Sequence, residues 1–221
     1  MKGKLIVIEG ACDGVGKTTQ YNLLKKYLED KGYNVYNHHF PTYNSKQGKI
    51  VEEFLNGDFG LPEELSPYLI NSMYAIDRAV TWKEELKEKY DAGNIILLDR
   101  YTTSSLIYQS CLYEKEEDKK EFIDYVLEYE YKKLGLQKPD KVIFLTGDFN
   151  ILSEMRKNRK DYEGNSNDVF ERDINLMKKI YDNSSFVADY LNFDIIKVDD
   201  NKKLRSIENI HNEIIKKIEE M

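Results

Sequence analysis

Residues 10–19 combine glycines, a lysine and two threonines in a pattern suited to holding phosphate groups. They follow the apolar run Leu5–Ile8 and precede a helical pattern, the strand–loop–helix context of a phosphate-binding loop. Gly14 and Gly16 let the backbone N–H groups face phosphate oxygens, and the next helix adds its positive N-terminal end. Lys17 can reach the β- and γ-phosphates, and the Thr18 hydroxyl can bind Mg²⁺. The loop therefore predicts a nucleoside triphosphate site made by Asp13, Gly14, Val15, Gly16, Lys17, Thr18 and Thr19.

The loop departs from the usual spacing at its first position. The pattern G-x-x-x-x-G-K-[ST] puts a glycine at position 11, where this chain has Ala11, and the nearest glycine is Gly10. Either Ala11 tolerates the required backbone angles or the loop carries one extra residue. A glycine-rich turn without a ligand is the alternative, and the strand and helix on either side argue against it.

A charged pair, Asp99-Arg100, directly follows the apolar run Ile95–Leu98. A carboxylate at the end of a buried parallel strand projects into the crevice at the carboxyl edge of the sheet, where ligands bind. We expect Asp99 to face the phosphate loop, where it can hold Mg²⁺ or accept a proton, and Arg100 to bind a second phosphate. The alternative is a plain ion pair at a strand end.

Tyr74 and Arg78 are four residues apart in a helical pattern and so share one face. A ring that stacks and a guanidinium that donates to a carbonyl oxygen suit a nucleobase. The alternative is a half-buried tyrosine beside a surface arginine.

The segment His38–Tyr43 contains Phe40-Pro41, which predicts a rigid turn able to wall a pocket. Adjacent histidines in a strand point to opposite sides and no third ligand is evident, so we expect no metal site there.

A basic cluster at residues 155–160 precedes a polar stretch rich in asparagine. In an acidic chain this pattern predicts a short lid, approximately residues 153–168. Its Arg156 and Arg159 would close over the phosphates and stabilise charge on the group being transferred. A surface helix end with solvated basic residues is the alternative.

Apolar runs predict the elements that position these residues. Five runs fit buried strands: Leu5–Ile8, Tyr33–Asn37, Ile95–Leu98, Val142–Leu145 and Phe193–Val198. Helical patterns separate them, at Lys17–Lys31, Lys46–Asn56, about Pro67–Tyr90, Thr103–Leu112, Lys119–Leu134, after Phe149, at Asp168–Leu191 and at Ser206–Glu220. The alternation indicates an α/β fold with a parallel sheet covered by helices on both faces, in one domain of residues 1–221.

Composition narrows the class of function. The net charge is −7, from 33 basic and 40 acidic side chains, which argues against binding to nucleic-acid polymers or to anionic membranes. Cys12 and Cys111 predict reduced thiols, and we expect a cytoplasmic protein. We see no signal-peptide core after Met1–Lys4 and no apolar run of membrane-spanning length.

Taken in chain order, these segments resemble the thymidylate kinases, a family of nucleoside monophosphate kinases. The resemblance rests on Ile8-Glu9-Gly10, residues 13–20, Phe40-Pro41, Tyr74, Asp77-Arg78, Asp99-Arg100-Tyr101, Ser104, Tyr108-Gln109, Lys138-Pro139-Asp140 and the basic cluster, and it covers nearly the whole chain. It implies a three-layer P-loop NTPase fold, a five-stranded parallel sheet and a homodimer. It also implies transfer of the γ-phosphoryl group of ATP to dTMP with Mg²⁺, giving ADP and dTDP on the route to dTTP.

The resemblance implies roles at matching positions. Asp13 would lie near the acceptor sugar and the transferring phosphate, Tyr74 would stack on the thymine and Arg78 would bind its carbonyl. Arg100 would hold the dTMP phosphate, with Asp99 and Thr18 near the metal. The rest of the acceptor pocket would be Phe40, Pro41, Ser104, Ser105, Tyr108 and Gln109.

Two departures from the family pattern affect these roles. Some relatives carry a basic residue directly after the loop aspartate, but this chain has Gly14, so the resemblance implies a catalytic arginine from the lid, Arg156 or Arg159. Many relatives have an arginine soon after Phe-Pro, where this chain has Thr42-Tyr43.

Two other functions stay open at this point. One is a kinase for dUMP, another nucleoside monophosphate or a deoxynucleoside. The other is a nucleotide-binding switch protein, although a switch has no need of the second nucleotide pocket that Tyr74, Arg78, Asp99 and Arg100 predict. The dimer surface is also open between the helices around Tyr68–Val80 and Ser104–Leu112.

Overall fold

Five parallel strands form the central sheet of the computed structural model, which describes residues 2–157, 168–170 and 172–221. The strands are β1 (Lys4–Gly10), β2 (Val35–His39), β3 (Ile95–Asp99), β4 (Lys141–Thr146) and β5 (Asp194–Lys197). Their order is β2-β3-β1-β4-β5, and every neighbouring pair is parallel. The α/β prediction is confirmed.

The second strand starts two residues later than predicted. The N–H of Tyr33 donates to the carbonyl of Leu28 at 3.1 Å, and Gly32 takes the left-handed conformation with φ of +87°. Residues 31–34 therefore complete the end of the preceding helix before the chain extends.

Helices lie at each place where a helical pattern predicts one. They are α1 (Lys17–Asp30), α2 (Lys49–Asn56), α3 (Pro67–Thr81), α4 (Lys87–Asp91), α5 (Thr102–Tyr108), α6 (Glu116–Leu127), α7 (Phe149–Lys157), α8 (Ile174–Tyr190) and α9 (Ile207–Glu219). Short 3₁₀ turns lie at Pro62–Glu64 and Ser110–Leu112. Two π turns, Trp82–Leu86 and Glu128–Lys133, continue α3 and α6, and a hairpin of β6 (Asp199–Asp200) and β7 (Lys203–Leu204) was not predicted.

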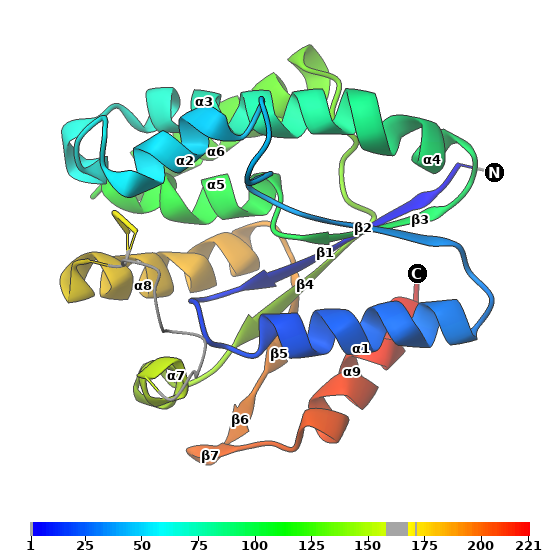
Figure 1. Ribbon diagram of the computed structural model, residues 1–221. Coiled ribbons are helices and arrows are strands. Elements are labelled where there is room, and N and C mark those ends of the chain that lie inside the picture. The colour runs from blue at the N-terminus through cyan, green and yellow to red at the C-terminus, as the bar shows by residue number, and fades with distance from the viewer. Residues whose placement is uncertain (1, 158–167, 171) are drawn as a thin grey trace.

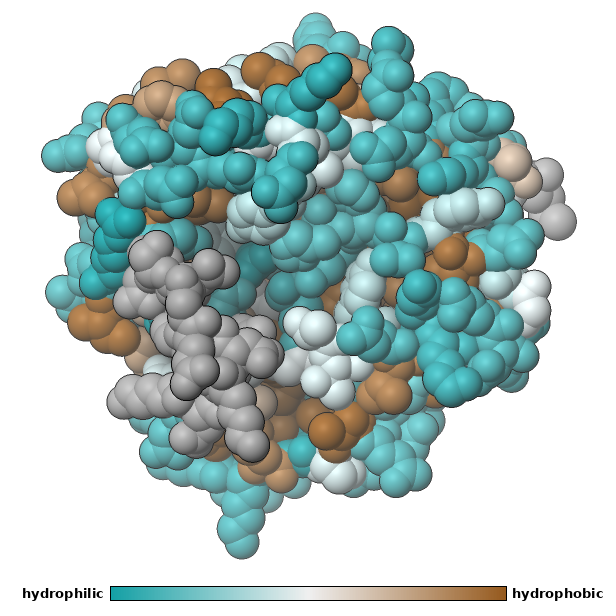
Figure 2. Space-filling model, in the orientation of Figure 1, coloured by the Kyte–Doolittle hydropathy of each residue, from teal (hydrophilic) through white to brown (hydrophobic). Residues whose placement is uncertain are grey.

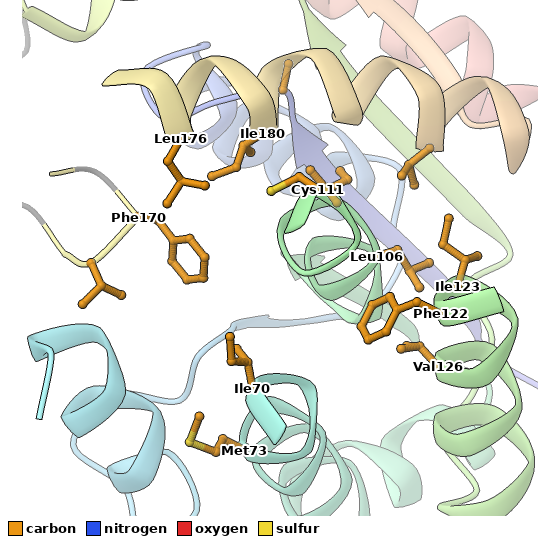
Figure 3. Packing of buried hydrophobic residues seen from close by; sticks show 14 of the residues in the cluster. Ile70, Met73, Leu106, Cys111, Phe122, Ile123, Val126, Phe170, Leu176 and Ile180 are labelled. Atoms are coloured by element: carbon orange, nitrogen blue, oxygen red, sulfur yellow. The ribbon is translucent and has the colours of Figure 1, made fainter. Parts of the chain in front are cut away.

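The sheet divides the core into layers (Figure 1). Alternate residues of β1 point to opposite faces, so Ile6 and Ile8 pack with the cluster beneath α1 and α9, whereas Leu5 and Val7 pack with the cluster that includes Trp82. A further cluster lies between α3, α5, α6 and α8, where the side chains of Leu106, Phe122, Ile180 and their neighbours converge (Figure 3). Packing on both faces of the sheet fixes the position of β1 and β3, and so of Asp99 at the end of β3.

Helix α3 leaves an apolar stripe uncovered in the single chain. Leu69, Ile76 and Val80 are exposed, and their spacing of seven and four places them on one face. Hydrophobic side chains also show along the upper edge of Figure 2, over α3, on a face that is otherwise mostly hydrophilic. Helix α5, the other candidate for a dimer surface, is mostly buried in the core instead.

The helices were compared with the length and apolar character of a membrane span. Within the described ranges, no helix has both the length and the apolar character needed to cross a bilayer.

Loops after β1, β2 and β3 meet at one edge of the sheet. In the register of the strands, Ile8 lies beside Asp99 and His39 lies beside Asp99 on the other side. The phosphate loop, the Asp99-Arg100 pair and the segment His39–Tyr43 therefore face one crevice, as expected at the carboxyl edge of a parallel sheet.

The ring of His38 makes stability depend on pH. It packs 4.7 Å from the ring centre of Phe40, and its Nε2 lies 3.0 Å from Thr42 Oγ1. Burial lowers the pKa of His38 below its usual value, so the unfolded chain takes up a proton that the folded chain resists. We expect the free energy of unfolding to fall as the pH drops through the usual histidine pKa of about 6.5, and to fall less steeply in His38→Gln, as measured by urea denaturation.

Burial also lowers the pKa of His211, so the double variant His38→Gln/His211→Gln should have the flattest profile. An identical slope in wild type and both variants would rule out this account.

Candidate active site

A cavity of about 760 Å³ opens where the three loops meet. Its size suits a small-molecule ligand site. The predicted site residues that line it are Asp13, Gly14, Gly16, Lys17, Thr18, Thr19, Pro41, Tyr74, Asp99, Arg100, Ser104, Ser105, Tyr108 and Gln109. The structure thus brings the two halves of the predicted site together.

The phosphate loop owes its shape to two glycines. Gly14 and Gly16 have φ of +90° and +94°, in the left-handed region that favours glycine, and α1 begins immediately afterwards at Lys17. The first turn of α1 contains no acidic residue, so its free N–H groups and positive end are available to an anion. Ala11 has no positive φ, and its N–H donates to the Leu145 carbonyl at 2.9 Å, so an ordinary residue fits at position 11.

Gly14 also lets α7 approach the loop. A Cβ at this position would lie 3.0 Å from both the Cα and the Cβ of Arg156, in α7. The nitrogen Nη1 of Arg156 contacts the sulfur of Met177, a residue that lines the cavity. The absence of a side chain after Asp13 and the presence of Arg156 at the loop are therefore linked by packing.

This packing predicts different effects at the two loop glycines. Gly14→Ala combines backbone strain with collision against α7, whereas Gly16→Ala meets nothing within 4 Å. In nucleotide-free protein, urea denaturation should show a loss of about 1 kcal/mol for Gly16→Ala and about 2–3 kcal/mol for Gly14→Ala. Equal losses would mean that α7 does not rest on Gly14.

Asp99 contacts the side chains of Lys17 and His39 in the wall of the cavity. Its Oδ1 lies 2.6 Å from Nζ of Lys17, and its Oδ2 lies 3.1 Å from Nδ1 of His39. Burial alone would raise the pKa of Asp99, but the hydrogen bond from His39 and the charges of Lys17 and Arg100 outweigh burial and hold that pKa below its usual value. Asp99 is therefore a carboxylate at neutral pH.

Arg100 turns back into the cavity through a strained backbone. Its φ is +67°, in a region that costs a non-glycine residue about 1–3 kcal/mol. Its Nη2 donates to Asp13, its Nη1 lies 3.6 Å from the buried carboxylate of Glu9, and its guanidinium lies 5.4 Å from the ring centre of Tyr108. These contacts hold a cation opposite the phosphate loop.

The other end of the cavity carries polar groups and a ring. Tyr74, Ser105 and Gln109 line it, and Gln109 is 1% exposed. Within the part of the chain that the structure describes, Oε1 of Gln109 is buried without a hydrogen-bond partner. Such an acceptor is costly unless a ligand donates to it.

Four predicted site residues that the structure describes do not line the cavity, namely Val15, Phe40, Arg78 and Arg156. Val15 and Phe40 are buried, Phe40 against the ring of Tyr101 at 5.8 Å. Arg78 is 1% exposed and lies behind Ser105, bound to Glu130. The prediction that Arg78 shares a face with Tyr74 is confirmed, since its guanidinium lies 5.9 Å from that ring centre. Its contact with a base stays a prediction.

The structure describes only part of the predicted lid. Met155 and Asp168 line the cavity, and Arg156 packs on the loop. Arg159 and residues 158–167 lie outside the described residues.

Sequence reasoning missed several residues of the lining. They are Cys12, His39, Tyr43, Leu55, Phe170, Met177, Ile180 and Leu204. Cys12 is not a nucleophile, because burial raises the pKa of its thiol to about 12.

The family model described as thymidylate kinase matches residues 8–214. The chain belongs to the thymidylate kinase family. The probable thymidylate kinase of Methanocaldococcus jannaschii is 34% identical over 95% of this chain and 93% of its own, and the thymidylate kinase of Plasmodium falciparum is 30% identical over 98% and 90%. The thymidylate kinase structure from Candida albicans aligns with a TM-score of 0.72 at 23% identity, covering 99% of this chain and 92% of that one, and so supports the thymidylate kinase fold.

Proposed function

We propose that this member of the thymidylate kinase family transfers the γ-phosphoryl group of ATP to dTMP, giving ADP and dTDP for dTTP synthesis. The observation that carries the proposal is one cavity with a phosphate loop at one end and an aromatic, hydrogen-bonding compartment at the other. Phosphoryl transfer needs in-line positioning and neutralisation of charge rather than covalent help, and this arrangement supplies both.

At the donor end, the loop and α1 bind the triphosphate. The N–H groups around Gly14 and Gly16 and the start of α1 receive phosphate oxygens, and Lys17 neutralises the β- and γ-phosphates. Lys17 leaves Asp99 for the phosphates at little cost, since His39 and Arg100 also stabilise that carboxylate.

The donor set beside the loop fits Mg²⁺. The Thr18 hydroxyl and the Asp99 carboxylate both line the cavity and are hard oxygen ligands. Among the described residues no cluster of three or more His, Cys, Asp or Glu side chains is suited to a metal. Mg²⁺ typically takes one or two protein oxygens and fills its shell with phosphate and water. When bound, it would neutralise charge on the phosphates.

At the acceptor end, Arg100 would exchange Asp13 for the monophosphate, and Tyr74 would stack on the base. Gln109 lines the same end of the cavity and would contact the base or the sugar. Asp13 would then face the acceptor sugar and the transferring group. We assign the lid cation to Arg156, since α7 holds it against the loop.

An acceptor panel tests the proposal. ADP release is measured with ATP and each of dTMP, dUMP, dCMP, dGMP and thymidine in turn. We expect dTMP to be preferred and release to depend on the acceptor. Preference for thymidine would contradict the role of Arg100, and slow release without any acceptor would favour a switch protein.

We also propose a homodimer that buries the stripe of α3. Leu69, Ile76 and Val80 are exposed on one face of α3, and burying apolar surface favours association. Ile76→Glu should shift the sedimentation coefficient towards that of the monomer, whereas Lys26→Glu, on the exposed surface of α1, should not. A wild-type chain that sediments as a monomer would overturn this proposal.

We propose the cytoplasm as the site of action. Cys12 and Cys111 are both free and buried in separate parts of the core, which suits a reducing compartment.

A further inference from the structure

His39 and Asp99 meet at the ends of two neighbouring strands, in the wall of the cavity. They are register partners in β2 and β3, and the N–H of Phe40 donates to the carbonyl of Asp99 at 3.0 Å. Nδ1 of His39 lies 3.1 Å from Oδ2 of Asp99. Because a carboxylate can only accept, Nδ1 carries the hydrogen of this bond. The paired backbones thus hold the imidazole within reach of the carboxylate.

A second contact holds the plane of the imidazole. The ring of Tyr43 stacks on that of His39, with 6.0 Å between the ring centres and 21° between the planes. Both rings line the cavity. Backbone pairing and ring stacking together restrict the rotation of His39, and so they fix the direction in which Nδ1 donates.

Lys17 and His39 divide the two oxygens of Asp99 between them. Nζ of Lys17 donates to Oδ1 at 2.6 Å, whereas Nδ1 of His39 contacts Oδ2. In the proposed reaction Lys17 turns to the β- and γ-phosphates, so Oδ1 loses its contact. The terminal torsion of an aspartate is soft and does not fix the carboxylate plane. The hydrogen bond to Oδ2 is the side-chain contact that then remains, among those in the part of the chain that the structure describes.

Stability of the fold does not account for this arrangement. The side chain of His39 is 46% exposed, and a pair with so exposed a member contributes little to stability. The preceding residue, His38, packs against Phe40 and Thr42 and is not part of the cavity wall. His39 can therefore be replaced in a folded chain, and its contact with Asp99 serves the site.

We propose that His39 is a positioning residue that orients Asp99 for a divalent cation. By holding Oδ2, it keeps Oδ1 directed to the side that Lys17 occupies here, where the cation or one of its waters would bind. Removing a group that orients a metal-binding carboxylate typically lowers metal affinity about 10–100-fold. The inference rests on the proposed function in taking Asp99 as a group that holds Mg²⁺ beside the triphosphate.

Calorimetry of nucleotide binding, with and without metal, tests the proposal. Full-length protein is titrated with β,γ-imido-ATP, whose γ-phosphoryl group is not transferred, once in Mg²⁺ and once in EDTA. The Kd in EDTA divided by the Kd in Mg²⁺ measures what the metal adds at the site. We expect His39→Leu to lower this ratio about tenfold, with the Kd in EDTA nearly unchanged.

Two variants separate the hydrogen bond from the bulk of the ring. His39→Asn places an amide N–H close to the position of Nδ1, so it should recover most of the ratio. His38→Gln, at the neighbouring histidine outside the cavity wall, is the matched control and should keep the wild-type ratio. An unchanged ratio in His39→Leu, or equal losses in His39→Leu and His39→Asn, would overturn the inference.

Thermal unfolding shows whether each variant is folded. If His39→Leu does not fold, Tyr43→Leu removes the stacked ring without touching Asp99 and should lower the ratio by a smaller factor. An unchanged ratio in that variant would then overturn the inference.

The acceptor panel keeps this inference separate from the proposed function. A wild type that releases ADP without depending on an acceptor would overturn the kinase reaction, whatever the ratio of the Kd values. A wild type that depends on dTMP, but binds β,γ-imido-ATP equally in Mg²⁺ and in EDTA, would overturn this inference alone.

Discussion

Lys17→Ala should reduce turnover by about 10³-fold while the protein stays folded. Lys17 is the cation at the start of α1, 2.6 Å from Asp99 and within the phosphate loop. Its loss leaves the charge that develops on the β- and γ-phosphates without its main protein counter-ion. ADP release at saturating ATP and dTMP measures the effect, and thermal unfolding reports the fold.

The same variant should change the ionisation of Asp99. Lys17 is one of the groups that lower the pKa of Asp99, so this pKa should rise in Lys17→Ala, with His39 and Arg100 still holding it down. Lys26→Ala is the matched control, because Lys26 lies on the same helix but pairs with Asp30 at the surface, and it should turn over like wild type. Unchanged turnover in Lys17→Ala would contradict the proposed kinase reaction at this loop.

Local patterns were sufficient to predict the donor half of the site. The apolar runs before Gly10 and Asp99 end where the sheet ends, and the edge to which each strand points follows from parallel pairing. Gly14 and Gly16 take the left-handed angles that the loop pattern requires. Each of these inferences depends on residues that are close in sequence, so the chain alone carried them.

The acceptor half depends on packing between distant segments. Helical spacing placed Tyr74 and Arg78 on one face correctly, but which of the two reaches the cavity is decided by Glu130, 52 residues later. Phe40 is likewise turned inward by Tyr101. No pattern within either segment contains this information, because the deciding contacts form only when the helices pack.

Glu130 nevertheless left a signal in the sequence. Phe122, Ile123 and Val126 form the buried stripe of α6, and Glu130 continues it at helical spacing, four residues after Val126. A carboxylate on an apolar stripe must find a buried cation, which makes Arg78 a reasonable partner to seek.

Arg100→Ala should impair the acceptor step about 10²-fold in kcat/KM for dTMP, with KM for ATP nearly unchanged. The guanidinium is held beside the phosphate loop by Asp13 and Tyr108, and the chain has Thr42-Tyr43 where many relatives carry a second arginine. The amide of Thr42 donates to Asp77 and its hydroxyl faces His38 and Thr81, away from the cavity. Arg100 therefore carries more of the acceptor phosphate charge.

Arg100→Lys separates charge from geometry in this prediction. Lysine keeps the charge but cannot give two parallel hydrogen bonds to a phosphate, so we expect it to recover only part of the loss. Both variants should also lower stability, since Glu9 is fully buried and 3.6 Å from Arg100, although Glu9 keeps hydrogen bonds from Thr103 and Ser104. Steady-state kinetics with dTMP varied at saturating ATP decides the assignment: an unchanged KM for dTMP with a raised KM for ATP would place Arg100 on the donor side, where it would compete with Lys17 for the same phosphates.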